Sequence, residues 1–91
     1  MITPQKKLTN AYNEFVRDFV ERHGECQATR DEAHERADWC KALGRSVVDL
    51  AKRLELSPDT IDWMVSAIPE IKEHEAYLVA CAVAAALEEV K

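Results

Sequence analysis

An unbroken apolar run lies near the C-terminus. The twelve residues from Ala76 to Leu87 are all apolar, and most of them are strong helix formers. A helix that is apolar on every side has to be surrounded by other parts of a protein. Crossing a bilayer takes roughly 20 apolar residues, and glutamates border the run on both sides. The pattern therefore predicts a buried core helix and not a membrane span.

A second apolar pattern predicts a helix at the N-terminus. Thr3 can cap it, with Pro4 at its first position, and Gly24 can end it in the left-handed conformation. Between them, apolar residues recur at helical spacing along one face: Leu8, Tyr12, Phe15, Val16, Phe19 and Val20. We expect this face to dock on the core.

The middle of the chain allows two interpretations. Thr29 and Glu32 form a capping-box pattern, which predicts a helix that starts at Thr29. Apolar and small residues follow in a four-three rhythm: Ala33, Ala37, Cys40, Gly44, Val47, Ala51 and Leu54. The helix either runs unbroken to Leu56 or breaks at Gly44, with Ser46 capping a new helix. We favour the break, because a stop signal and a start signal stand almost side by side.

Two further boundaries complete the predicted architecture. Ser57 and Pro58 form a cap and a first position for a short helix to about Ala67, and Pro69 is expected at the first position of the last helix. Only two Gly and three Pro occur, and no segment alternates with period two. We predict one all-α domain over residues 1–91, a compact bundle of four to five helices with a buried apolar C-terminal helix.

Charge and cysteine usage narrow the environment and the partners. The formal charge is −5, from 17 acidic and 12 basic residues, which disfavours nucleic acid and favours a basic partner. The N-terminus has no apolar signal region, so we expect a cytoplasmic protein. Cys26, Cys40 and Cys81 lack paired spacing, so we expect reduced thiols in the core and no structural disulfide.

Residues 46–66 form the most recognisable motif. They read SVVDLAKRLELSPDTIDWMVS, with apolar residues at Leu50, Ala51, Leu54, Leu56, Ile61 and Met64. The stretch resembles the helix-turn-helix family of DNA-binding domains, with Ala51 at the small position where the two helices cross. The resemblance implies DNA contacts from neighbouring basic and hydroxyl residues: Lys41, Arg45, Lys52, Arg53, Ser57 and Thr60.

The motif also departs from that family. Glu55 stands at the turn position where the family usually has Gly. The reading helix would expose Pro58, Asp59, Asp62, Trp63 and Ser66, none of them a usual major-groove reader. Two carboxylates facing phosphates would be repelled. These departures favour a helix pair that serves packing.

Acidic residues offer a different kind of surface. Along the first helix, carboxylates follow at steps of four, three and four: Glu14, Asp18, Glu21 and Glu25. This acidic stripe could occupy a basic groove in place of phosphates, or it is a solvated face partly neutralised by Arg17 and Arg22. On the short helix, Trp63 is expected at the margin of the core, as a cover or as a binding anchor beside Asp59 and Asp62.

The sequence contains no recognisable catalytic or metal-binding set. His23 and Cys26 are the only close pair of zinc-type ligands, whereas structural zinc sites usually combine two such pairs. No nucleophile has a base and an orienting group nearby in sequence. We therefore expect neither an enzyme, a metal nor a cofactor.

Together these features predict a small acidic helical module that binds a larger, basic, nucleic-acid-binding protein. In size, charge and helical content it resembles small inhibitors encoded by phages and mobile elements, anti-CRISPR proteins among them. The alternative is a helix-turn-helix transcriptional regulator. We also expect a homodimer, because the apolar helix needs neighbours and the small residues Ala37, Gly44 and Ala51 permit close helix packing.

Overall fold

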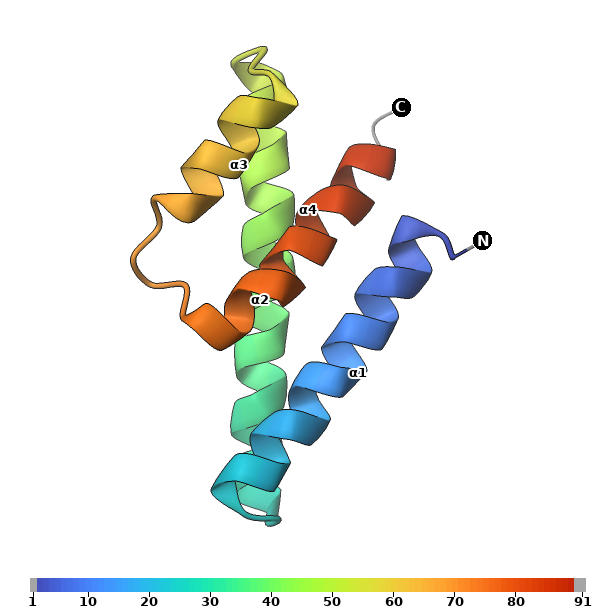
Figure 1. Cartoon of the computed structure of the whole chain (residues 1–91), viewed down its shortest axis with the longest axis vertical. Coiled ribbons are helices and arrows are strands. Elements are labelled where there is room, and N and C mark those ends of the chain that lie inside the picture. Colours follow the sequence, from blue (N-terminus) through green and yellow to red (C-terminus); the bar gives the residue numbers. More distant parts are fainter. Residues whose placement is uncertain (1, 90–91) are drawn as a thin grey trace.

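The computed structural model describes residues 2–89 and shows an all-α bundle. Its helices are α1 (Pro4–His23), α2 (Gln27–Arg53), α3 (Pro58–Ser66) and α4 (Ala76–Glu89), the last preceded by a 3₁₀ turn, η1 (Glu73–Glu75). Figure 1 shows α4 crossing in front of α2, with α1 on one side of this pair and α3 folded back beside α2 on the other. The predicted fold class is confirmed, and the described residues contain no strand.

Local capping signals define α1 as predicted. The Thr3 hydroxyl accepts a hydrogen bond from the backbone N–H of Lys6 at 3.2 Å, and Pro4 is the first helical residue. Gly24 ends the helix with φ 92°, and its N–H donates to the carbonyl of Val20 at 2.9 Å. A side chain at Gly24 would be strained in this left-handed conformation.

The predicted start of α2 is wrong. The helix begins at Gln27, with extended Cys26 as its cap, and no side chain caps it. The N–H of Arg30 already donates to the carbonyl of Cys26 at 3.1 Å, so backbone bonding starts the helix before Thr29. Thr29 therefore lies inside the first turn, where its hydroxyl is 3.2 Å from the Cys26 sulfur.

The predicted break at Gly44 is also wrong, because α2 is continuous over 27 residues. Gly44 is buried where α4 passes, and a Cβ atom there would lie 2.5 Å from the Cβ of Ala82. Glycine serves close helix approach here, not helix termination. The seam containing Ala37, Gly44 and Ala51 is buried within the chain itself, so it gives no support to a dimer.

The second half of the chain confirms one boundary and corrects another. The Ser57 hydroxyl caps α3 by accepting from the N–H of Thr60 at 3.3 Å. Pro69, however, lies in the turn between α3 and η1 and does not begin α4. The entry to α4 is instead organised by Glu75, whose carboxylate accepts from the N–H of Lys72 at 3.0 Å.

The apolar C-terminal run is largely buried, as predicted. Seven residues of α4 are buried: Leu78, Val79, Cys81, Ala82, Val83, Ala85 and Ala86. One side of the helix, carrying Tyr77, Ala80 and Ala84, stays exposed, so the helix is not surrounded on every side. Within the described part of the chain, no helix has the length and apolar character needed to span a membrane.

The three cysteines do not share one environment. All three are free thiols; Cys40 and Cys81 are buried, as expected for small core residues, but Cys26 is exposed. The expectation was wrong for Cys26 because the turn between α1 and α2 lies at the end of the bundle, away from the core (Figure 1). Burial raises the pKa of Cys40 to about 11, and the charge of Glu75 adds to this effect.

Candidate functional site

The crevice between α1 and α4 contains an acidic cavity. Its volume is about 220 Å³, and α1 contributes Glu14, Asp18 and Arg22 to its polar lining. Ala11, Phe15, His74, Tyr77 and Leu78 complete the walls. The His74 ring stacks on Phe15, with 5.9 Å between centroids and 10° between planes. Two carboxylates of the predicted acidic stripe thus line the same cavity as Phe15 of α1, His74 of η1 and Tyr77 of α4.

A second cavity continues the same crevice toward the start of α1. It measures about 340 Å³ and is mostly apolar. Its lining comprises Ile2, Pro4, Lys7, Tyr77, Ala80, Cys81 and Ala84. Tyr77 lines both cavities, so they adjoin at this residue, and we call the two cavities together the α1–α4 groove.

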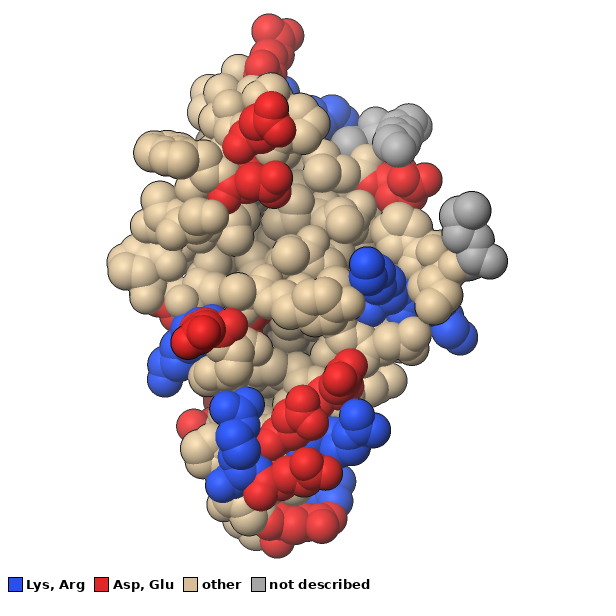
Figure 2. Space-filling model, in the orientation of Figure 1, with Lys and Arg blue, Asp and Glu red and all other residues tan. Residues whose placement is uncertain are grey.

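Large apolar side chains are exposed along the groove. Ile2 is 62% exposed and Tyr77 is 58% exposed. Figure 2 shows a mostly uncharged centre on the face where α4 lies in front, and red carboxylates along the lower part of α1. Interaction with the Cys81 side chain raises the pKa of Tyr77, and the charge of Glu14 contributes. Tyr77 is therefore a neutral hydrogen-bonding group at physiological pH.

The structure divides the predicted acidic stripe. Glu14 and Asp18 line the groove, whereas Glu21 is exposed further along α1 and outside the lining. Glu25 lies beyond the helix end and forms an ion pair with Arg30. Blue atoms border the red ones in this region of Figure 2. The part of the stripe that shares a surface with apolar residues is thus Glu14 and Asp18.

The predicted binding residues on α3 form a separate surface. Asp59, Asp62 and Trp63 lie on α3, which packs on α2 and lies across the bundle from α1 in Figure 1. Trp63 is 71% exposed and is not part of the core, which takes Ile61 and Met64 from this helix. The margin position expected for Trp63 is therefore wrong, and it does not cover the core. The α1 and α3 sets do not form one site.

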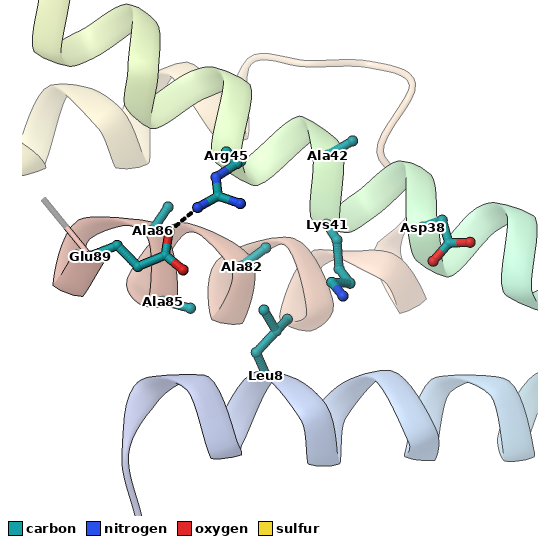
Figure 3. Close-up of a pocket in the computed structure, with 9 residues that line it drawn as sticks. All are labelled: Leu8, Asp38, Lys41, Ala42, Arg45, Ala82, Ala85, Ala86 and Glu89. Atoms are coloured by element: carbon teal, nitrogen blue, oxygen red, sulfur yellow. Dashed lines mark hydrogen bonds and ion pairs between the residues drawn. The ribbon is translucent and has the colours of Figure 1, made fainter.

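The basic residues assigned to DNA contact are partly engaged within the chain. Figure 3 shows Lys41 and Arg45 extending from α2 toward a cavity of about 320 Å³ bounded by α1, α2 and α4. Arg45 forms an ion pair with Glu89, and the Lys41 ammonium lies 5.3 Å from the Tyr12 ring centroid. Ser57 and Thr60 bond to each other at the cap of α3. Lys52 and Arg53 occupy the last turn of α2, where cations complement the helix dipole.

A polar cluster that the sequence analysis missed joins α1 to α2. The Tyr12 hydroxyl donates to the Asp38 carboxylate at 2.8 Å and lies 3.1 Å from Nδ1 of His34. Since the hydroxyl has one proton, His34 must donate from Nδ1 in this arrangement. Burial, then the bond and charge of Asp38, raise the pKa of Tyr12 to about 12. A general acid or base works best with a pKa near ambient pH, and the pKa of Tyr12 lies far above it. The cluster is therefore better suited to cross-linking α1 and α2 than to proton transfer.

A second missed contact fixes the start of α4. Arg36 donates two hydrogen bonds of 2.7 Å to the carboxylate of Glu75, whose side chain is 1% exposed. The guanidinium also lies 4.5 Å from the Trp39 ring centroid. Glu75 is one of the glutamates that border the apolar run in the sequence, where a solvated position is expected, but the structure buries it. Only the fold brings it to Arg36, 39 residues away, so no local signal could have identified the pair.

Neither a metal-binding arrangement nor a likeness to known proteins assigns a function to the groove. Among residues 2–89, no three His, Cys, Asp or Glu side chains are grouped so that they could hold a metal ion. No protein-family model, curated protein or solved structure matches the chain. Functional inference therefore rests on the surface itself.

Proposed function

We propose that this protein is a binding module that captures a larger, basic partner protein through the α1–α4 groove. The observation that carries this proposal is that the cavity lined by Glu14 and Asp18 and the neighbouring apolar cavity have Tyr77 as a common wall. Protein interfaces typically combine an apolar, often aromatic, centre with a polar rim. Carboxylates beside such a centre would attract a basic surface and orient it before contact.

The chemistry suits inhibition of a nucleic-acid-binding protein. A partner that binds phosphates carries a cationic surface, and carboxylates spaced along α1 can neutralise part of it. The small size and charge of −5 agree with the resemblance to phage and mobile-element inhibitors noted above. By covering the cationic surface of such a partner, the module would exclude the partner's nucleic acid by direct competition.

Charge reversal tests this function. Tagged protein is used to capture partners from the native host, and the partner identified by mass spectrometry is purified for binding calorimetry. We expect Glu14→Lys, Asp18→Lys and Glu21→Lys together to weaken its binding at least tenfold. A matched triple reversal at the exposed residues Glu32, Glu35 and Asp49 should leave the affinity within about twofold. Equal affinities for the wild type and the α1 triple variant would refute the proposal.

One observation favours the helix-turn-helix alternative. Glu55 adopts φ 54°, the left-handed conformation that the family's glycine usually provides in the turn. We propose DNA binding through Lys41, Arg45, Lys52, Arg53, Ser57 and Thr60 as the second candidate function. Strong heparin retention that falls steeply with salt, and that Lys52→Glu with Arg53→Glu abolishes, would favour this candidate over the protein-binding module.

A further inference from the structure

The α1–α4 groove has the length of a short helix. Along α1, the part of its lining from Pro4 to the second carboxylate, Asp18, spans fourteen residues, and Arg22 lies one turn beyond. At a rise of 1.5 Å per residue this corresponds to about 21 Å. Tyr77 lines both cavities. A partner helix of about fourteen residues would therefore reach from Pro4 to Asp18.

The side chains on α4 permit a helix to approach closely. Ala80 and Ala84 are exposed and lie on the same side of α4 as Tyr77, at steps of three and four residues. Methyl groups at these positions leave the backbone of α4 accessible to apolar side chains on a neighbouring helix. Ile2 and Tyr77 supply larger apolar side chains to the same cavity. Apolar anchors at i, i+3 or i+4, and i+7 of a partner helix would match this surface.

The two ends of the groove carry opposite charges. Lys7 lines the apolar end, while Glu14 and Asp18 line the other end together with Arg22. A helix is itself more stable with acidic residues in its first turn and basic residues in its last turn. A partner helix with this distribution of side-chain charges, lying parallel to α1, would pair its acidic first turn with Lys7 and its basic last turn with Glu14 and Asp18.

We infer that the groove binds an amphipathic helix of the partner, oriented parallel to α1. Its apolar face lies on Ile2, Tyr77 and the exposed alanines of α4, and its C-terminal cations pair with Glu14 and Asp18. The inference rests on the proposed function and adds the conformation, direction and chemistry of the bound segment.

A designed peptide tests the inference directly. The probe is a fluorescently labelled fourteen-residue helix with Leu and Ala on one face, Glu in its first turn and Lys in its last turn. We expect fluorescence anisotropy to detect its binding, and a peptide of the same composition without an apolar face to bind at least tenfold more weakly. Equal binding of the two peptides, or binding of neither, would overturn the inference.

Variants of the protein locate the probe. Ala80→Arg places a bulky cation in the groove and should weaken probe binding at least tenfold. Ala42→Arg is the matched control, because Ala42 is also an exposed helical alanine but lies on α2 outside the groove. Circular dichroism checks that both variants fold, and Ala84→Arg replaces Ala80→Arg if the latter does not. Equal loss in the groove and control variants would overturn the assignment.

Charge compensation tests the orientation. Asp18→Lys should weaken binding of the probe, and changing the last-turn Lys residues of the peptide to Glu should restore binding to this variant. A peptide with the acidic and basic ends exchanged should bind the wild-type protein more weakly than the original probe. Restoration by changes at the first turn instead of the last would reverse the direction and contradict the inference.

Two outcomes separate this inference from its alternatives. A homodimer in sedimentation equilibrium that Ala80→Arg dissociates would assign the groove to a second copy of the chain and overturn the partner-helix inference. If the α1 triple reversal abolishes capture of the natural partner while the probe never binds, the helical occupant is wrong and the proposed function stands. If the triple reversal leaves partner capture unchanged, the proposed function itself is wrong.

Discussion

At the scale of single residues, burial of the Glu75 carboxylate has a clear electrostatic consequence. Burial by itself would raise the pKa of this carboxyl group. The hydrogen bonds from Arg36 and from the N–H of Lys72, with the charge of Arg36, instead lower the pKa below its usual value. The ion pair therefore compensates the cost of burying a charge at the entry to α4, and removing either partner would leave that cost unopposed.

We expect Glu75→Gln to lower the free energy of unfolding by about 2 kcal/mol. Loss of one member of a fully buried pair typically costs about 3–5 kcal/mol, but the Arg36 side chain is 32% exposed, so water screens part of the effect. Urea unfolding at neutral pH measures the difference. Glu73→Gln, at an exposed position two residues earlier, is the control and should change stability by less than about 0.5 kcal/mol. Equal stabilities of the two variants would contradict this account.

The same carboxyl group predicts a pH dependence. Because its pKa in the folded state is lowered, its stabilising contribution is complete above the pKa of about 4.3 in the unfolded chain and is lost as pH falls through the folded value. The stability gap between the wild type and Glu75→Gln should be constant from about pH 7 to pH 5 and shrink toward about pH 3. Urea unfolding across this range measures the gap. A gap that does not narrow in acid would show that ionisation of Glu75 is not its source.

At the scale of elements, the packing of α4 against α2 depends on Gly44. A Cβ atom at this position would lie 2.5 Å from the Cβ of Ala82 and 3.0 Å from the backbone nitrogen of Val83. Two rigid helix backbones meet there, so the contact cannot be relieved by turning a flexible side chain. The close approach also explains why a helix-breaking residue is found in the interior of a continuous helix.

We expect Gly44→Ala to destabilise the protein by about 1–2 kcal/mol. In an exposed helix interior the same change gains about 1 kcal/mol, whereas overpacking a core costs roughly 1–3 kcal/mol, and the short contacts favour the upper end of that cost. Chemical denaturation measures the sign. Adding Ala82→Gly should recover part of the loss, because it removes the nearest atom. A stabilised Gly44→Ala variant would mean that α2 and α4 are further apart than described.

The elements could be predicted from sequence wherever a short-range signal decided them. The caps at Thr3 and Ser57 and the stop at Gly24 involve groups within four residues of one another, and all three were predicted correctly. The errors at Thr29, Gly44 and Pro69 arose where packing between distant elements, or backbone bonding alone, overrode the local signal. Gly44 is the clearest case, since its role depends on Ala82.

The candidate site was predictable only in part, for the same reason. The spacing of Glu14 and Asp18 along α1 is visible in the sequence, but the groove also needs His74 from η1 and Tyr77 from α4. Because α4 is apolar on all sides, its sequence pattern does not indicate which side stays exposed. The pairing of α1 with α4 decides it, and that pairing is a property of the fold.

At the scale of the whole molecule, stability is unevenly distributed. α3 has nine residues, buries only Ile61 fully and packs mainly on α2. A helix of this length has little stability of its own, whereas α2 and α4 bury seven residues each. We therefore expect α3 to open without unfolding the remainder of the bundle.

Hydrogen exchange measured by mass spectrometry tests this expectation. Amides of α3 should exchange faster than those at the centres of α2 and α4, and Ile61→Ala should accelerate exchange in α3 while leaving α4 protected. Because the α1–α4 groove contains no residue of α3, it should remain formed while α3 is open. The affinity of the helical probe should then change by less than about twofold in Ile61→Ala, since a preformed groove has no ordering cost that depends on α3. Equal acceleration in α3 and α4 would instead show that the bundle opens as one cooperative unit.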